Sequence, residues 1–204
     1  MLRERIHGES ATVKTELHRR LHAGRSGLLS TLEGLDEYDL RRPMTPTGTN
    51  LLGLVKHLAG LEYGYLGEPF DRPAPETFSW VEDGSIWQGA DMWATTDETS
   101  EYLIGLYRRA CTHADRTVDE LEPSTPGRVA HWPEERRDTT LGTLLIRMVA
   151  ETAQHAGHAD IVRELIDGHA GSDHDSVLDE AGWRTYVAAI QSAADSFAPG
   201  TGTG

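Results

Sequence analysis

The sequence is poor in cysteine, in positive charge and in long apolar runs. One cysteine, Cys111, excludes an internal disulfide framework and a zinc site built from several thiolates. No run approaches the ~18 apolar residues that span a bilayer, and the opening MLRERIHGES has no apolar stretch typical of a secretory signal. The 19 Lys and Arg against 33 Asp and Glu leave a net charge of −14. That sign repels phosphate backbones and anionic lipid, so we expect no nucleic-acid partner, no membrane partner and a cytoplasmic location.

The pattern of apolar residues predicts an all-α fold. Apolar side chains recur at three- and four-residue steps over four long segments, at 13–35, 51–67, 97–122 and 139–167. Gly168 is a natural stop for the last of them, and a shorter helix is expected over 179–195. The polar and proline-rich segments between the long helices read as loops, and no strand pattern competes. We therefore predict a four-helix bundle with long crossover loops and an extra C-terminal helix, as a single domain over 1–195 with a flexible tail at 196–204.

The helix expected over 139–167 carries Glu151, His155 and His158. At ~100° per residue, all three fall within an apolar stripe that also holds Leu144 and Leu165, so we expect them on the buried face. Glutamate is rarely buried without a partner, and a metal cation would compensate its charge. Glu151 and His155 are four residues apart, a spacing that suits two ligands of one ion.

A third ligand is available on the helix expected over 51–67. His57 shares a face with Leu54 and with glycines that allow close approach of another helix. Two histidines and one carboxylate leave a coordination position open, as in catalytic zinc sites. Zinc is the first choice, although nickel, iron and manganese accept the same ligands. The alternatives are a hydrogen-bonded core histidine at His57 and a solvated helix face at Glu151 and His155.

Other side chains have several possible roles. His158 could be a fourth ligand, could hold a ligand in place, or could act catalytically by moving protons. Arg147 could contact an anionic cofactor, pair with an acid in the core, or lie at the surface rim. The aromatic segment 68–95, with Trp80, Trp87 and Trp93, could cover an apolar substrate or plug the end of the bundle.

Two motifs resemble the actinobacterial branch of the DinB-like (DinB/YfiT-like) superfamily. They are KHLAGLEYG and ETAQHAGHADIVRELIDG, and the resemblance extends over residues 10–168. It implies a four-helix bundle with a divalent metal held by His57 and by the pair Glu151 and His155, and this glutamate variant is similar to mycothiol-dependent maleylpyruvate isomerase. Many relatives have a histidine where this chain has Arg147, and H-R-G-Q where it has residues 155–158.

The resemblance implies an enzyme that activates a low-molecular-weight thiol, such as mycothiol, for S-transfer to a small electrophile or for its isomerisation. A metal lowers the pKa of a bound thiol and so favours the reactive thiolate. Cys111 is expected in the middle of a helix as a small core residue, so the thiol would come from a co-substrate. Two alternatives stay open: a metal-dependent hydrolase, and a non-catalytic metal-binding protein for stress or ligand binding. We expect a small-molecule substrate and, as the commonest assembly, a homodimer.

Overall fold

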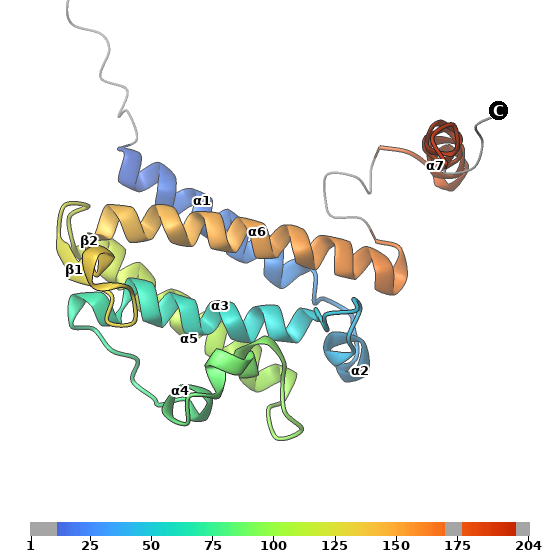
Figure 1. Cartoon of the computed structure of the whole chain (residues 1–204). Helices are drawn as coiled ribbons and strands as arrows, with labels where there is room; N and C mark the ends of the chain where they lie inside the picture. Colours follow the sequence, from blue (N-terminus) through green and yellow to red (C-terminus); the bar gives the residue numbers. More distant parts are fainter. Residues whose placement is uncertain (1–11, 170–176, 199–204) are drawn as a thin grey trace, which may run out of the picture.

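Four long helices pack side by side in the computed structural model, which describes residues 12–169 and 177–198 (Figure 1). They are α1 (Val13–Ser30), α3 (Leu51–Leu66), α5 (Ser100–Glu120) and α6 (Leu141–Asp167). Helix α3 packs against both α5 and α6, and α1 packs mainly against α6. The predicted all-α bundle is confirmed.

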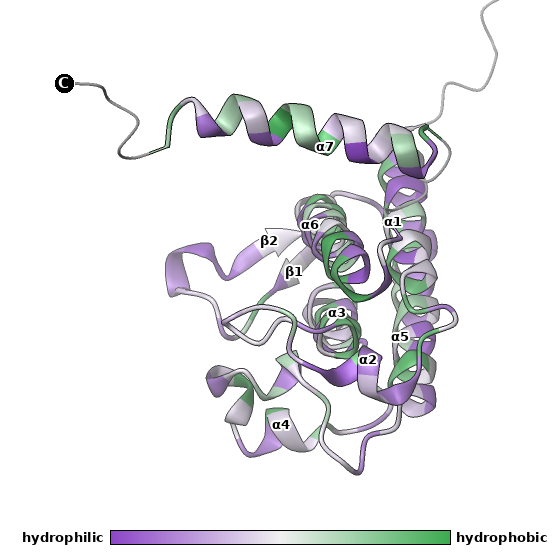
Figure 2. Cartoon of the chain, turned by 90° about the vertical axis from the view of Figure 1, so that its right-hand side faces the viewer, coloured by the Kyte–Doolittle hydropathy of each residue, from purple (hydrophilic) through white to green (hydrophobic). Residues whose placement is uncertain are grey.

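The order of the helices around the bundle makes two connections cross it. Seen nearly end-on in Figure 2, α1, α6, α3 and α5 stand at successive corners. The helices α1 and α3 are therefore diagonal, and so are α5 and α6, although each pair is consecutive among the long helices. Residues 31–50 and 121–140 run across opposite ends of the bundle to join them (Figure 1). The sequence predicts long crossover loops, and the connection 121–140 is one of them. The longest predicted loop, 68–95, instead joins the neighbouring helices α3 and α5.

Side-chain caps fix where the long helices begin. Each capping oxygen accepts a backbone N–H three residues on, which satisfies an amide left free in the first turn. The caps are Thr12, Asn50, Thr99 and Thr140. Helix α5 begins later than predicted because Glu98 accepts the backbone N–H of Thr95 at 2.8 Å and holds that segment as a turn. Helix α6 ends at Gly168, whose φ of 81° is left-handed, as predicted.

The connecting segments contain short elements that the sequence did not predict. Two antiparallel strands pair before α6, with Pro126 opposite Thr140. Elements of three to five residues are too short for periodicity to reveal, which is why these segments read as plain loops. They are α2 (Glu37–Arg41), η1 (Glu68–Phe70), α4 (Ser79–Glu82), η2 (Ser85–Gln88), η3 (Ala90–Met92), β1 (Pro126–Arg128), η4 (Glu134–Arg136) and β2 (Asp138–Thr140).

Helix α3 is the most buried of the long helices and includes two buried charged residues. Lys56 donates to the Glu98 carboxylate at 2.8 Å and to the carbonyl of Trp93 at 3.1 Å. Glu62 is held by Arg25 of α1. Because each buried charge has a partner of opposite sign, the central helix can cross the core without an unpaired ion.

The last described helix, α7 (Glu180–Asp195), lies apart from the bundle (Figure 2). None of its residues is buried, and Tyr186, Val187 and Ile190 are exposed. The predicted helix is confirmed, whereas the homodimer stays a prediction. Residues 1–11, 170–176 and 199–204, which include most of the predicted tail, lie outside the described residues. In the part of the chain that is described, no helix combines the length and apolar character needed to cross a membrane.

Candidate metal centre

The structure brings together the three side chains predicted as metal ligands. His57 comes from α3, and Glu151 and His155 come from the facing helix α6. Their ligand atoms all lie within 4.8 Å of one another. The two imidazole rings meet edge to face, with centroids 5.0 Å apart. All three side chains are partly buried, so a cation between them would be screened from water yet still accessible.

In each of the two histidines, one ring nitrogen, Nδ1, already has a partner outside the group of three ligands. Nδ1 of His57 lies 2.6 Å from Oδ2 of Asp91. An ionised carboxylate can only accept, so Nδ1 is the donor here and Nε2 is the nitrogen left to bind a metal. Nδ1 of His155 lies 3.4 Å from Nδ1 of His158, while its Nε2 lies 3.8 Å from Oε2 of Glu151. Metal-binding histidines show this arrangement, with the outer nitrogen held and the inner one free.

The protonation state of His155 also suits a ligand. Burial lowers its pKa to about 4, and the charges of His57 and His158 act in the same direction, against the attraction of Glu151. The ring is therefore neutral at pH 7. A neutral imidazole is the form that binds a metal.

Sequence reasoning missed Asp91, which lies in η3, far along the chain from His57. It is buried, and its carboxylate holds that histidine. No spacing rule connects the two residues, because a folded aromatic segment brings them together. The sequence offered one indication of such a partner, namely an acidic residue among the tryptophans of 68–95.

We expect Asp91→Ala to weaken metal binding by about 10- to 100-fold, because the orientation and basicity of His57 would no longer be fixed. Competition with a chromophoric chelator measures the change in affinity. Asp97→Ala is the matched control, since Asp97 is an exposed aspartate of the same connection. Equal affinities in the two variants would contradict the role given to Asp91.

Arg147 contacts the centre through Glu151. It lies 2.9 Å from Oε1 of that carboxylate, which leaves Oε2 on the side of His155. Its guanidinium also stacks over Tyr65 at 4.7 Å and over Trp132 at 5.5 Å. Among the described residues its buried Nε has no hydrogen-bond partner. Arg147 thus positions Glu151.

The buried face of α6 differs from the predicted one. It is centred roughly 60° from Glu151 at ~100° per residue. The buried residues are Leu141, Leu144, Leu145, Met148, Thr152, Ala159 and Val162. Glu151 therefore lies at the edge of the core, His158 is exposed, and Leu165, which the prediction counted as core, is 57% exposed. The argument that a metal must compensate a buried, unpaired glutamate is therefore wrong. The evidence for a metal is the arrangement of the two histidines around Glu151.

The aromatic residues singled out in the sequence divide into two groups. Trp80 is buried, stacks on Phe78 at 4.9 Å and lies under the Lys56 ammonium at 4.2 Å, so it plugs the bundle. Trp93 and Trp87 are exposed.

Trp87 adjoins a wall of rings that the sequence did not reveal. Its ring lies 5.9 Å from that of His131, which in turn lies 5.8 Å from Tyr65. Tyr65 and Trp132 are the rings under Arg147, so this wall extends to Glu151. It offers apolar surface next to the candidate metal centre.

The lone thiol does not belong to the site. Burial raises the pKa of Cys111, and the nearby Glu62 carboxylate, 4.0 Å from Sγ, raises it further. The thiol is therefore protonated at neutral pH and is not a nucleophile. This agrees with the expected core role of Cys111.

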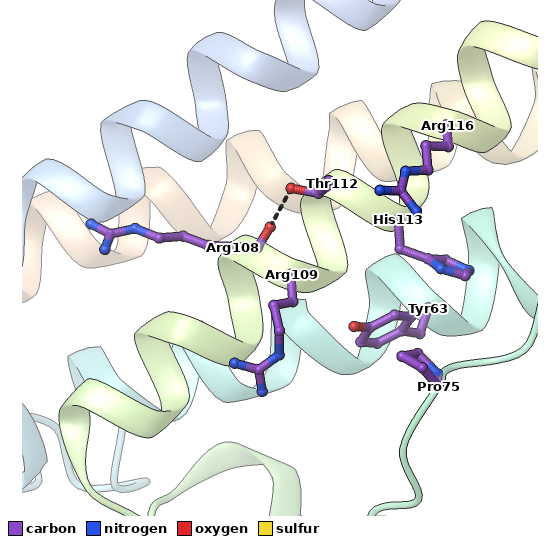
Figure 3. Close-up of a pocket in the computed structure, with 7 residues that line it drawn as sticks. All are labelled: Tyr63, Pro75, Arg108, Arg109, Thr112, His113 and Arg116. Atoms are coloured by element: carbon purple, nitrogen blue, oxygen red, sulfur yellow. Dashed lines mark hydrogen bonds between the residues drawn. The ribbon is translucent and has the colours of Figure 1, made fainter.

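A separate hollow of about 330 Å³ lies on α5 and contains none of the three candidate ligands. Arg108, Arg109 and Arg116 line it together with Tyr63 and His113 (Figure 3). Arg109 already pairs with Glu76 at 3.1 Å. We therefore do not assign this hollow to the metal centre.

Comparison with known proteins identifies relatives of the chain. A family model described as mycothiol-S-transferase matches residues 16–168. A crystal structure of a conserved protein from Enterococcus faecalis is similar in fold, with a TM-score of 0.59 and 13% identity over 77% of this chain and 98% of that one. No curated protein matches the chain.

Proposed function

The chain belongs to the mycothiol-S-transferase family, a DinB-like family, and we propose that it is a divalent-metal-dependent enzyme acting on a mycothiol-like thiol. The reaction proposed is S-transfer to a small electrophile, or isomerisation of one. The observation that carries the proposal is that the ligand atoms of His57, Glu151 and His155, from two facing helices, lie within 4.8 Å of one another. Asp91 holds Nδ1 of His57, and His158 lies beside Nδ1 of His155. A divalent metal bound there, zinc as first choice, would lower the pKa of a coordinated thiol.

The side chains of the site have separate tasks in this proposal. His57, Glu151 and His155 hold the metal and leave a position open for the thiol. Asp91 and Arg147 fix the orientation of His57 and Glu151. The Arg147 side chain, which is 40% exposed, is the group that we assign to contact with the thiol co-substrate. Because the pKa of Cys111 is raised, the reacting sulfur comes from that co-substrate.

His158 is the residue to which we assign proton movement. Its ring is exposed and touches the outer nitrogen of His155, so it both borders the site and exchanges protons with water. An exposed imidazole can take up the thiol proton directly or through one water and release it to solvent. The electrophile would rest on the wall of Tyr65, Trp132 and Trp87, the last of which is 74% exposed.

The test is an assay of thioether formation by zinc-loaded protein with mycothiol and an alkyl halide. The S–C bond forms as the carbon–halogen bond breaks, and the thiol proton passes to the buffer. We expect turnover above the uncatalysed rate that requires the thiol and stops when a chelator removes the metal. Halide release that is indifferent to the thiol would instead indicate a hydrolase. Stable metal binding without turnover of any tested electrophile would favour a non-catalytic metal-binding protein.

A further inference from the structure

A second group of potential ligands lies between α1 and α5. His18 and His22 are one helical turn apart on α1, with ring centroids 4.5 Å apart. Both point to Asp115 of α5: its Oδ1 lies 2.8 Å from Nε2 of His18 and 3.6 Å from Nε2 of His22. The ligand atoms of the three residues lie within 4.8 Å of one another. No residue of this group belongs to the centre between α3 and α6.

A further carboxylate supports one of these histidines from behind. Oδ1 of Asp119, one turn along α5 from Asp115, lies 3.6 Å from Nδ1 of His18. His18 therefore has its outer nitrogen near a carboxylate and its inner nitrogen towards the cluster. The contact is longer than the 2.6 Å hydrogen bond between His57 and Asp91.

The charges around the cluster leave a net negative site. Arg25 donates to both oxygens of Glu62, at 2.7 and 2.6 Å, and also to Oδ1 of Asp115 at 2.6 Å, so one buried cation faces two carboxylates. Although burial raises the pKa of Asp115, the charge and hydrogen bond of Arg25 and the hydrogen bond of His18 lower it further, so Asp115 is ionised at neutral pH. Lys14 donates to the backbone carbonyls of Asp119 and Leu121 rather than to either carboxylate. Two carboxylates thus face two imidazoles.

We propose that His18, His22 and Asp115 form a second metal site that links α1 to α5. Two imidazoles and one carboxylate favour a zinc-like transition-metal dication over magnesium or calcium, which prefer oxygen ligands. The metal would lie where Nε2 of His18, Nε2 of His22 and Oδ1 of Asp115 meet. Because α1 rests mainly on α6, this link would tie it to the remaining neighbouring helix.

The experiment is Zn²⁺ stoichiometry by equilibrium dialysis and elemental analysis of the whole chain. We expect His22→Ala to bind one equivalent less than the unchanged protein. His22 is 53% exposed, so its removal should leave the fold intact, which circular dichroism checks. His169→Ala is the matched control, because His169 is 65% exposed and also lies beside a carboxylate, Asp167, at 3.1 Å. Equal binding by the His22→Ala variant and the unchanged protein would overturn the proposal.

A second measurement separates the two sites. In a variant with His57→Ala and His155→Ala, Zn²⁺ should still raise the melting temperature, and adding His22→Ala should abolish that rise. If the double variant shows no Zn²⁺-dependent rise although it is folded, the second site is wrong whatever the fate of the first. If the unchanged protein loses metal only through His22→Ala, the second site stands and the proposed catalytic centre fails.

Discussion

Replacing His155 with alanine is expected to weaken metal binding at the proposed catalytic centre by more than about 100-fold and to abolish thiol transfer. The estimate follows because removal of a ligand must cost more than the 10- to 100-fold lost with a residue that only supports one. His57→Ala should have the same effect, since each histidine contributes one ligand atom to the same group. The measurements are metal affinity by chelator competition and the rate of thioether formation.

His158→Ala is the contrasting variant. His158 is exposed and touches only the outer nitrogen of His155, so the centre should keep its metal. If His158 moves protons, turnover should still fall by about 10²- to 10⁴-fold, the range typical of general acid–base groups. A double variant with His57→Ala and His155→Ala that bound as much metal as the unchanged protein would refute the catalytic centre. If the double variant retained metal only at the cluster of His18, His22 and Asp115, the catalytic centre would not be refuted.

The three candidate ligands could be predicted because each of them follows from local sequence. Glu151 and His155 are four residues apart on one helix, and His57 lies in a motif of the family that the sequence resembles. The partners that hold them depend on tertiary contacts. Asp91 reaches His57 only because the segment after α3 folds back through short helices, none long enough to show a period. The cluster of His18 and His22 could not be predicted for the same reason, since their partner Asp115 is on another helix.

Burial on α6 was the part of the prediction that failed. A helical wheel gives the angle between residues but not which direction faces the core. The predicted stripe contained Leu144, Met148 and Val162, which are buried, and Leu165, which is exposed. The small residues Thr152 and Ala159 extend the buried face on the other side. A methyl group added to Gly24 of α1 would lie only 3.0 Å from Cγ2 of Thr152, which shows how closely the two helices approach there. Small residues at a close helix crossing carry little hydrophobic signal, although they mark the interface.

The largest loss of stability is expected from breaking the pair between Arg25 and Glu62. Arg25 is 4% exposed and Glu62 is 0% exposed, and two charge-assisted hydrogen bonds join them. Burial raises the pKa of Glu62, and Arg25 acts in the opposite direction. Arg25→Ala leaves the Glu62 carboxylate buried without its partner, so we expect a loss of about 3–5 kcal/mol in the free energy of unfolding. Urea denaturation followed by circular dichroism measures it.

Two comparisons make this prediction specific to a buried pair. Arg128→Ala removes one half of the exposed pair with Asp138, at 2.9 Å, and should cost at most about 1 kcal/mol. The variant with both Arg25→Met and Glu62→Leu removes both charges while filling the space, so it should be more stable than Arg25→Ala alone. If Arg25→Ala lowered the free energy of unfolding no more than Arg128→Ala does, the buried pair of Arg25 and Glu62 would stabilise the fold no more than a surface pair. A double replacement as unstable as the single one would instead mean that the loss arises at Asp115, the third partner of Arg25, and not at Glu62.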